Sequence, residues 1–186
     1  MSRFIWFLLL LILPLISTKS QIASHWNTDS SYYFYQATDE NLISEKISFK
    51  QDLTKKEILD SIAHYLTDVF FVTSNKYYKD KIKIAVNVQK LTTIEVSKRN
   101  LYIATINIVD PDKICMGTYF QGSTGGRITF LMLVSNLIQP QLEYPLLDGV
   151  IILYNSEELK QLDHINLEGL ISEREIDNAV RRAITH

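Results

Sequence analysis

The sequence predicts a single α+β domain, in which a mixed or antiparallel sheet packs against two main helices and a short helix follows near the C-terminus. Three observations support this fold class. Segments with strand-like alternation and segments with helical periodicity follow one another from residue 32 to residue 165. The 186 residues, 46% apolar and 22% charged, suffice for one substantial core. No internal repeat or low-complexity stretch is visible, and the six glycines and four prolines mark no second domain boundary.

The first segment, residues 1–20, predicts an export signal. Arg3 precedes an unbroken apolar run from Phe4 to Ile16. As a helix this run would span about 20 Å, short of the roughly 30 Å hydrocarbon core of a bilayer. Cleavage after Ser20 or Ala23 and retention as an N-terminal anchor are both open. Either way, we expect an extracytoplasmic protein, in the periplasm or at the outer face of the cytoplasmic membrane.

The folded part is expected to begin near residue 32, after a polar linker over residues 21–31. The aromatic run Tyr32–Tyr35 and the segment Ile43–Phe49 predict two short strands with a turn at residues 39–41.

A helix is predicted from Leu53 onward, capped by Asp52 or Thr54. Its buried face is indicated by apolar residues at intervals of three and four: Ile58, Leu59, Ile62, Ala63, Leu66, Val69 and Phe70.

Three strands are then expected, over residues 82–88, 94–96 and 101–109. The polar break Ser97–Asn100 predicts a hairpin turn between the last two, with Asn100 at a positive φ. Asp110–Asp112, with a central proline, ends the last of the three strands.

A buried helix is predicted over Arg127–Ile138, after the glycine-rich turn Gly122–Gly126 and before Pro140. Val150–Tyr154 predicts a central strand covered on both faces. Residues 166–186 form a predicted helical extension, because Ser172 and Glu175 have the spacing of a capping box.

This order of segments resembles the GerMN family of sporulation and germination domains. The likeness rests on Tyr32–Tyr35, on the strand Tyr102–Val109 before Phe120–Gly126, on the helix Leu131–Gln139 and on the strand Gly149–Leu153. It implies an extracytoplasmic α+β module over residues 32–165, of a kind found in spore-envelope assemblies and envelope lipoproteins, with no recognised catalytic centre.

Two features depart from the family pattern. Asn155–Glu157 stands where members often have a glycine turn, and no cysteine for lipid attachment follows the signal. The single cysteine, Cys115, can form neither an intramolecular disulfide nor a cysteine-based metal cage. With 19 basic and 21 acidic residues and a net charge of -2, the chain has no basic patch for nucleic acid.

No constellation of residues in the sequence indicates catalysis. Gly122–Arg127 lacks the lysine and hydroxyl of a phosphate loop, so we interpret it as a capping turn with Ser123 or Thr124 as N-cap. Ser123 is out of frame for a nucleophile elbow. Cys115 beside a histidine remains an alternative, as does a buried apolar role. The histidines are spread too widely for a metal site: His25, His64, His164 and His186.

The acidic residues that follow residues 150–154 or lie near the C-terminus are interpreted as solvated faces. Tyrosine is enriched at binding surfaces, so the predicted contact residues are Tyr32, Tyr33, Tyr35, Tyr77 and Tyr78. We therefore expect a non-catalytic binding or assembly module without a cofactor, recognising an envelope protein complex or peptidoglycan. The alternative is an exported hydrolase or small-ligand-binding protein whose site forms only in the fold.

Overall fold

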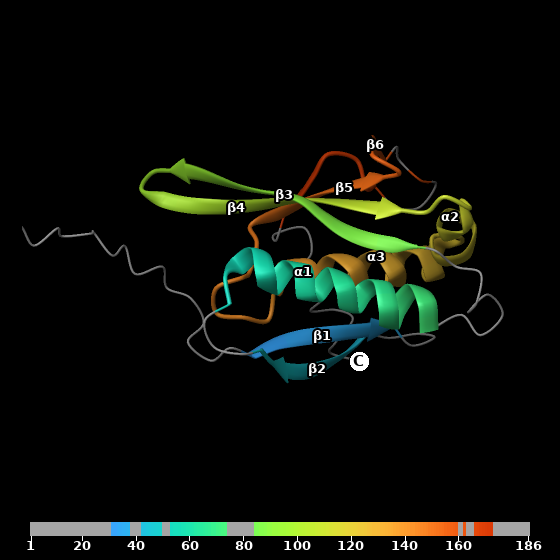
Figure 1. Ribbon diagram of the computed structural model, residues 1–186, viewed down its shortest axis with the longest axis horizontal. Helices are drawn as coiled ribbons and strands as arrows, with labels where there is room; N and C mark the ends of the chain where they lie inside the picture. Colours follow the sequence, from blue (N-terminus) through green and yellow to red (C-terminus); the bar gives the residue numbers. More distant parts are fainter. Residues whose placement is uncertain are drawn as a thin grey trace, which may run out of the picture.

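The computed structural model describes residues 31–37, 42–49, 53–73, 84–159, 162 and 166–172. The elements lie in three layers: a mixed main sheet, a middle layer of helices α1 (Lys55–Tyr65) and α3 (Ser123–Ile138), and a hairpin of β1 (Ser31–Ala37) and β2 (Leu42–Ser48) (Figure 1). The predicted α+β class is confirmed. The separate hairpin layer was not predicted.

Both predicted early strands are present, and they pair antiparallel with each other rather than joining the main sheet. β1 packs on α3, and its side chains Tyr32, Phe34 and Tyr35 are buried in the core. The predicted turn at residues 39–41 lies outside the described residues.

Helix α3 forms the centre of the core, as its apolar sequence predicts, and Leu131–Gln139 is buried throughout. Two of its polar residues pair with the backbone of β1. Asn136 Oδ1 accepts from the Tyr35 N–H at 3.0 Å, and its Nδ2 donates to the Tyr35 carbonyl at 2.9 Å. Gln139 makes the same two contacts with Tyr33, both at 2.7 Å. Two side-chain amides thus replace a neighbouring strand along β1.

Helix α1 has the predicted buried face, and it begins at Lys55, two residues after the predicted Leu53, with one of the two predicted caps. Thr54 is its N-cap, with Glu57 completing a capping box. Its buried residues are Ile58, Leu59, Ile62 and Ala63. The helix continues as a π-helical segment, η1 (Leu66–Thr73), in which Leu66 and Phe71 are buried. The side chains of the predicted Val69 and Phe70 lie outside the described residues, as does Asp52.

The two strands predicted over residues 82–88 and 94–96 are one strand, β3 (Ala85–Val96), with a bulge between Val88 and Lys90. The bulge explains the wrong prediction. Val86 and Val88 face the helices, and strict alternation would put Lys90 there as well. The extra residue turns Lys90 outward and Leu91 inward, so the apolar pattern changes phase without ending the strand.

The turn of the next hairpin is shorter than predicted. β4 (Arg99–Val109) pairs antiparallel with β3, and only Ser97 and Lys98 lie between them. Their φ angles are 50° and 68°, the pair of positive values that a type I′ turn requires. Asn100 is therefore not the positive-φ residue: it lies within β4, opposite Glu95.

After β4, the chain forms a short helix that was not predicted, α2 (Ile114–Tyr119). The next helix, α3, begins at Ser123 and includes Gly125 and Gly126, which were assigned to a turn. Its N-cap is Gly122, with φ 74°, and no side chain caps it, so the predicted N-cap role of Ser123 or Thr124 is wrong. The predicted stop before Pro140 is confirmed, with Gln139 in the left-handed region.

The main sheet continues with β5 (Gly149–Tyr154), which pairs parallel with β4. Val150 and Ile152 are buried against the helices, but Ile151 and Leu153 on the other face are only half-buried, so the strand is not fully covered on both faces as predicted.

Two further strands follow β5 and pair antiparallel with it: β6 (Glu157–Glu158) and β7 (Leu170–Ser172). β7 is a strand inside the region predicted to be a helical extension, so the sheet reaches beyond the predicted boundary at residue 165. The predicted C-terminal helix from residue 173, the export signal and residues 21–30 of the linker lie outside the described residues. None of the described helices is long and apolar enough to cross a membrane.

Candidate functional site

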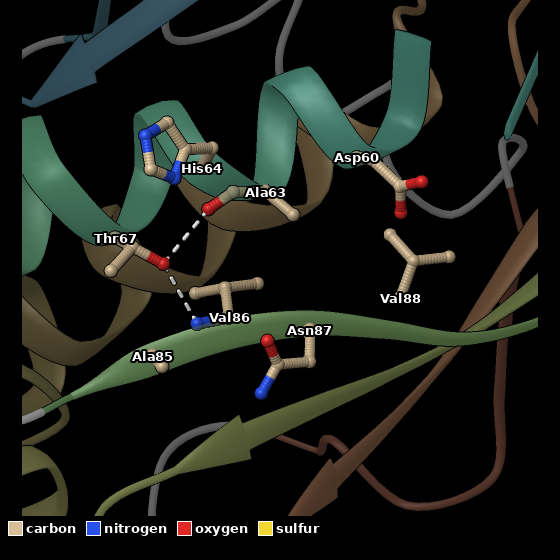
Figure 2. A pocket seen from close by; sticks show the side chains of 8 residues that line it. All are labelled: Asp60, Ala63, His64, Thr67, Ala85, Val86, Asn87 and Val88. Carbon is tan, nitrogen blue, oxygen red and sulfur yellow. Dashed lines mark hydrogen bonds between the residues drawn. The ribbon is translucent and has the colours of Figure 1, made fainter. Parts of the chain in front are cut away.

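A groove of about 250 Å³ lies between α1 and the first half of β3 (Figure 2). Four of its residues come from one stripe of the helix, at intervals of three and four, and four are consecutive in the strand. The lining residues are Asp60, Ala63, His64, Thr67, Ala85, Val86, Asn87 and Val88.

The groove follows the edge of the main sheet, because β3 is the end strand of the described order β3-β4-β5-β6. Thr67 Oγ1 accepts a hydrogen bond from the Val86 N–H at 2.8 Å and donates one to the Ala63 carbonyl at 3.0 Å (Figure 2). The Val86 N–H therefore points away from β4.

The direction of that one N–H determines the direction of the others. In an antiparallel pair, residues alternate between those whose backbone groups face the partner strand and those whose groups face away. Val88 therefore turns its N–H and carbonyl toward the groove. Beyond the bulge, the register places the backbone N–H and carbonyl groups of Leu91, Thr93 and Glu95 on the side away from β4 as well.

The rim of the groove carries two ion pairs within the helical segment. Lys56 Nζ lies 2.7 Å from Asp60 Oδ2, and His64 Nε2 lies 2.9 Å from Asp68 Oδ2. The side chain of His64 is 78% exposed, so this pair contributes little to stability. The groove thus offers polar groups at its rim and the small apolar side chain of Ala63 at its floor.

A second cluster joins α1 to β4 where Tyr102 pairs with Thr93. Lys55 Nζ lies 3.8 Å from the centre of the Tyr102 ring and donates to the Leu146 carbonyl. Burial lowers the pKa of Lys55 to about 7, and the carboxylate of Asp148 opposes that shift. Asp148 accepts from Arg99 at 2.7 Å and from the Tyr102 N–H at 2.8 Å.

The contacts of the Lys55 cluster join separate parts of the fold. The Lys55 side chain holds the loop before β5 against the first turn of α1, and Asp148 fixes the start of that strand beside β4. A perturbed lysine pKa is common at functional sites, but ion-pair networks that only hold a structure together also produce it.

Cys115 has the predicted buried apolar role. Its side chain is fully buried, and burial together with the nearby Asp110 raises the pKa of the thiol, which disfavours the thiolate that nucleophilic chemistry needs. His64 is exposed and paired with Asp68, and the other three histidines lie outside the described residues.

Asp110 instead organises the end of β4. Its carboxylate accepts from the Cys115 N–H at 2.6 Å and from the Tyr154 hydroxyl at 2.8 Å. Asn155 bonds the backbone N–H and carbonyl of Asp110 through its side-chain amide. Asn155 and Ser156 both have positive φ, 51° and 69°, so this pair makes a tight two-residue turn between β5 and β6.

Two of the five tyrosines predicted as a contact surface, Tyr32 and Tyr35, are buried and cannot serve as one. Tyr32 and Tyr35 are 7% and 0% exposed and belong to the core, and Tyr33 is partly buried against it. Tyr77 and Tyr78 lie outside the described residues. For Tyr32 and Tyr35 the prediction is wrong, because an aromatic strand run fits a buried strand as well as it fits a binding surface.

The groove beside β3 was missed by sequence reasoning. The only signal was a polar stripe of Asp60, His64 and Thr67 beside the apolar stripe of the same helix. Within the part of the chain that the structure describes, no three His, Cys, Asp or Glu residues gather as a metal site would need. Comparisons with protein-family models, curated proteins and solved structures give no match to this chain.

Proposed function

We propose that this chain is a non-catalytic binding module of the bacterial envelope that receives an extended segment of another envelope protein along β3. The observation that carries the proposal is the groove between α1 and the edge strand β3. The extracytoplasmic location rests on the apolar N-terminal run and on the resemblance to GerMN domains.

The edge of β3 has the chemistry for adding a strand. Its outward backbone groups at Val88, Leu91 and Thr93 match those of an extended peptide, which gains main-chain hydrogen bonds by pairing there. The Val86 N–H already donates a hydrogen bond to Thr67, so an added strand could not pair with it. Val86 therefore marks one end of the edge that can accept a strand. An added strand would run from Val88 toward the hairpin turn.

The helix beside this edge supplies selectivity. A side chain of the added strand that points toward the helices would meet Ala63, between Asp60 and His64. A small or apolar side chain of the added strand fits against Ala63, and polar side chains beside it can form hydrogen bonds with Asp60 or His64. Main-chain pairing thus provides affinity, and the floor of the groove selects the sequence.

Site-specific photocrosslinking tests the proposal in the full-length protein within its native envelope. A crosslinking amino acid replaces His64 at the groove or, as control, Lys46 on β2, which is exposed in the opposite layer. We expect one reproducible protein adduct from position 64 only. Mass spectrometry identifies the adduct and the processed N-terminus together.

A matched pair of variants then tests strand addition itself. Thr93→Pro removes an N–H that faces away from β4, so the β3–β4 ladder keeps its hydrogen bonds, whereas Thr93→Ala keeps that N–H. The adduct should disappear in Thr93→Pro and persist in Thr93→Ala. Equal adducts from position 46, a glycan adduct, or an adduct insensitive to Thr93→Pro would each contradict the proposal.

A further inference from the structure

The far end of the β3–β4 hairpin, residues 90–103, has most of its aliphatic side chains on the side opposite to the core. We name these residues the arm; the hairpin extends past the helix layer as a two-stranded projection (Figure 1). Nearer the core, Ala104 and Ile106 are buried against the helices. On that same inner face of the arm, Leu91 and Tyr102 still pack against the core, whereas Thr93, Glu95 and Asn100 are polar and exposed.

The outer face of the arm is correspondingly apolar. Ile94 lies opposite Leu101, and Thr92 lies opposite Ile103. Ile94 and Val96 are 42% and 46% exposed, which is unusual for large aliphatic side chains at neighbouring positions of one face. Two paired strands alone are marginally stable, so an arm of this kind is expected to have a surface to rest on.

The apolar strip continues onto the main sheet. Ile103 lies opposite Gly149, and a methyl placed on Gly149 would meet Leu170 Cδ1 at 2.7 Å. The Leu170 side chain therefore lies over Gly149 on the outer face, and it is 50% exposed. The strip reaches from the hairpin turn to β7.

The charged side chains on the outer face of the arm itself are basic. Lys90 and Arg99 lie on the outer face of the arm, and Lys98 is in its turn. The carboxylate within the arm, Glu95, belongs to the inner face. Asp148 lies 2.7 Å from Arg99 and neutralises part of its charge. Lys90 and Lys98 therefore determine the positive charge at the edge of this apolar strip.

We propose that the outer face of the arm docks on an anionic phospholipid bilayer. Aliphatic side chains fit the interfacial region, and lysines at the rim fit acidic headgroups. A second copy of the chain fits less well, because face-to-face packing would bring the lysine rims of the two copies together. The apolar run Phe4–Ile16 ends 14 residues before β1, a span of at most about 50 Å, so a retained run would hold the arm within reach of the bilayer.

The test uses an environment-sensitive fluorophore on full-length protein reconstituted in vesicles. Cys115 is fully buried, so a cysteine introduced at residue 94 or 93 takes the label. Ile94→Cys reports the outer face, and Thr93→Cys, one residue away, reports the inner face of the same strand. The vesicles contain either phosphatidylcholine alone or phosphatidylcholine with phosphatidylglycerol.

We expect a blue shift and protection from dithionite at position 94 in the anionic vesicles, with position 93 unchanged. The ratio of protected to unprotected label at position 94 measures membrane binding. Lys90→Gln and Lys98→Gln should each lower this ratio about fivefold. Equal signals at positions 93 and 94, or equal signals with and without phosphatidylglycerol, would overturn the proposal. A shift that depends on protein concentration without vesicles would instead indicate pairing of two copies. Thr93→Pro leaves the outer face intact, so failure of strand addition and failure of lipid docking are separable.

Discussion

Lys55, the first residue of α1, contacts the ring of Tyr102 in β4 from 3.8 Å. The same ammonium group donates to the Leu146 carbonyl in the loop before β5. One side chain therefore joins a helix, a strand and a loop at the base of the arm. Since burial lowers the pKa of Lys55 to about 7, this joint responds to pH near neutrality.

We expect the stability of the protein to rise as the pH increases above about 7. The folded pKa of Lys55 is about 7 and its ordinary value is 10.5, so between these values the unfolded chain binds one more proton than the folded one. The free energy of unfolding then increases with pH. Urea unfolding at pH 7.0, 8.0 and 9.0, compared with Lys55→Met, isolates the effect. A constant difference between the two proteins over this range would contradict the prediction.

Asn136→Leu should destabilise the fold by about 2–4 kcal/mol, because it leaves the Tyr35 N–H and carbonyl buried without partners. The neighbouring Ser135→Ala is the matched control. Ser135 is equally buried, and its Oγ has no hydrogen-bond partner among the described residues, so its loss should change stability little. Denaturant unfolding measures both, and equal effects would refute the pairing role of Asn136.

Gly149→Ala should weaken the docking of β7. An added methyl would lie 2.7 Å from Leu170 Cδ1 and 3.1 Å from the Ile171 carbonyl oxygen. Overpacking of this size costs about 1–3 kcal/mol. Leu170→Ala in the same chain should restore part of the loss, since the backbone contact remains. Hydrogen exchange of residues 170–172 reads out the pairing directly, and unchanged protection in Gly149→Ala would disprove the close approach.

Replacing Ser97-Lys98 by Asn-Gly should stabilise the arm, because these residues adopt the positive φ of a type I′ turn more readily. The gain is expected to be about 0.5–1 kcal/mol. Asn100→Gly should have the opposite effect, since Asn100 lies within β4. Thermal unfolding of the two variants distinguishes the two-residue turn from a longer one with its positive φ at Asn100.

Elements with a long, regular pattern could be predicted from the sequence. The capped start of α1 at Thr54, its buried stripe and the apolar α3 were all recognised, because local propensity and burial agree there. The strand predictions were wrong where a single residue changes the pattern. The bulge after Val88 made one strand resemble two, and the turn at Ser97 and Lys98 carries none of the residues usual for positive φ.

The candidate site could not be predicted, because it depends on which strand lies at the edge of the sheet. That position follows from the parallel pairing of β4 with β5, which joins segments separated by more than forty residues. The use of Asn136 and Gln139 as partners for β1 is similar. Polar residues in an apolar helix signal a buried hydrogen bond, but the sequence does not name its partner.

The bonds between β1 and α3 also have a consequence for the order in which the chain folds. Tyr33 and Tyr35 are made first, yet their partners Gln139 and Asn136 follow more than a hundred residues later. The hydrogen bonds between β1 and α3 therefore cannot form until nearly the whole domain has been produced. Contacts this distant slow folding, so the β1–β2 layer is expected to close last and to be the part of a nascent chain that most needs a chaperone.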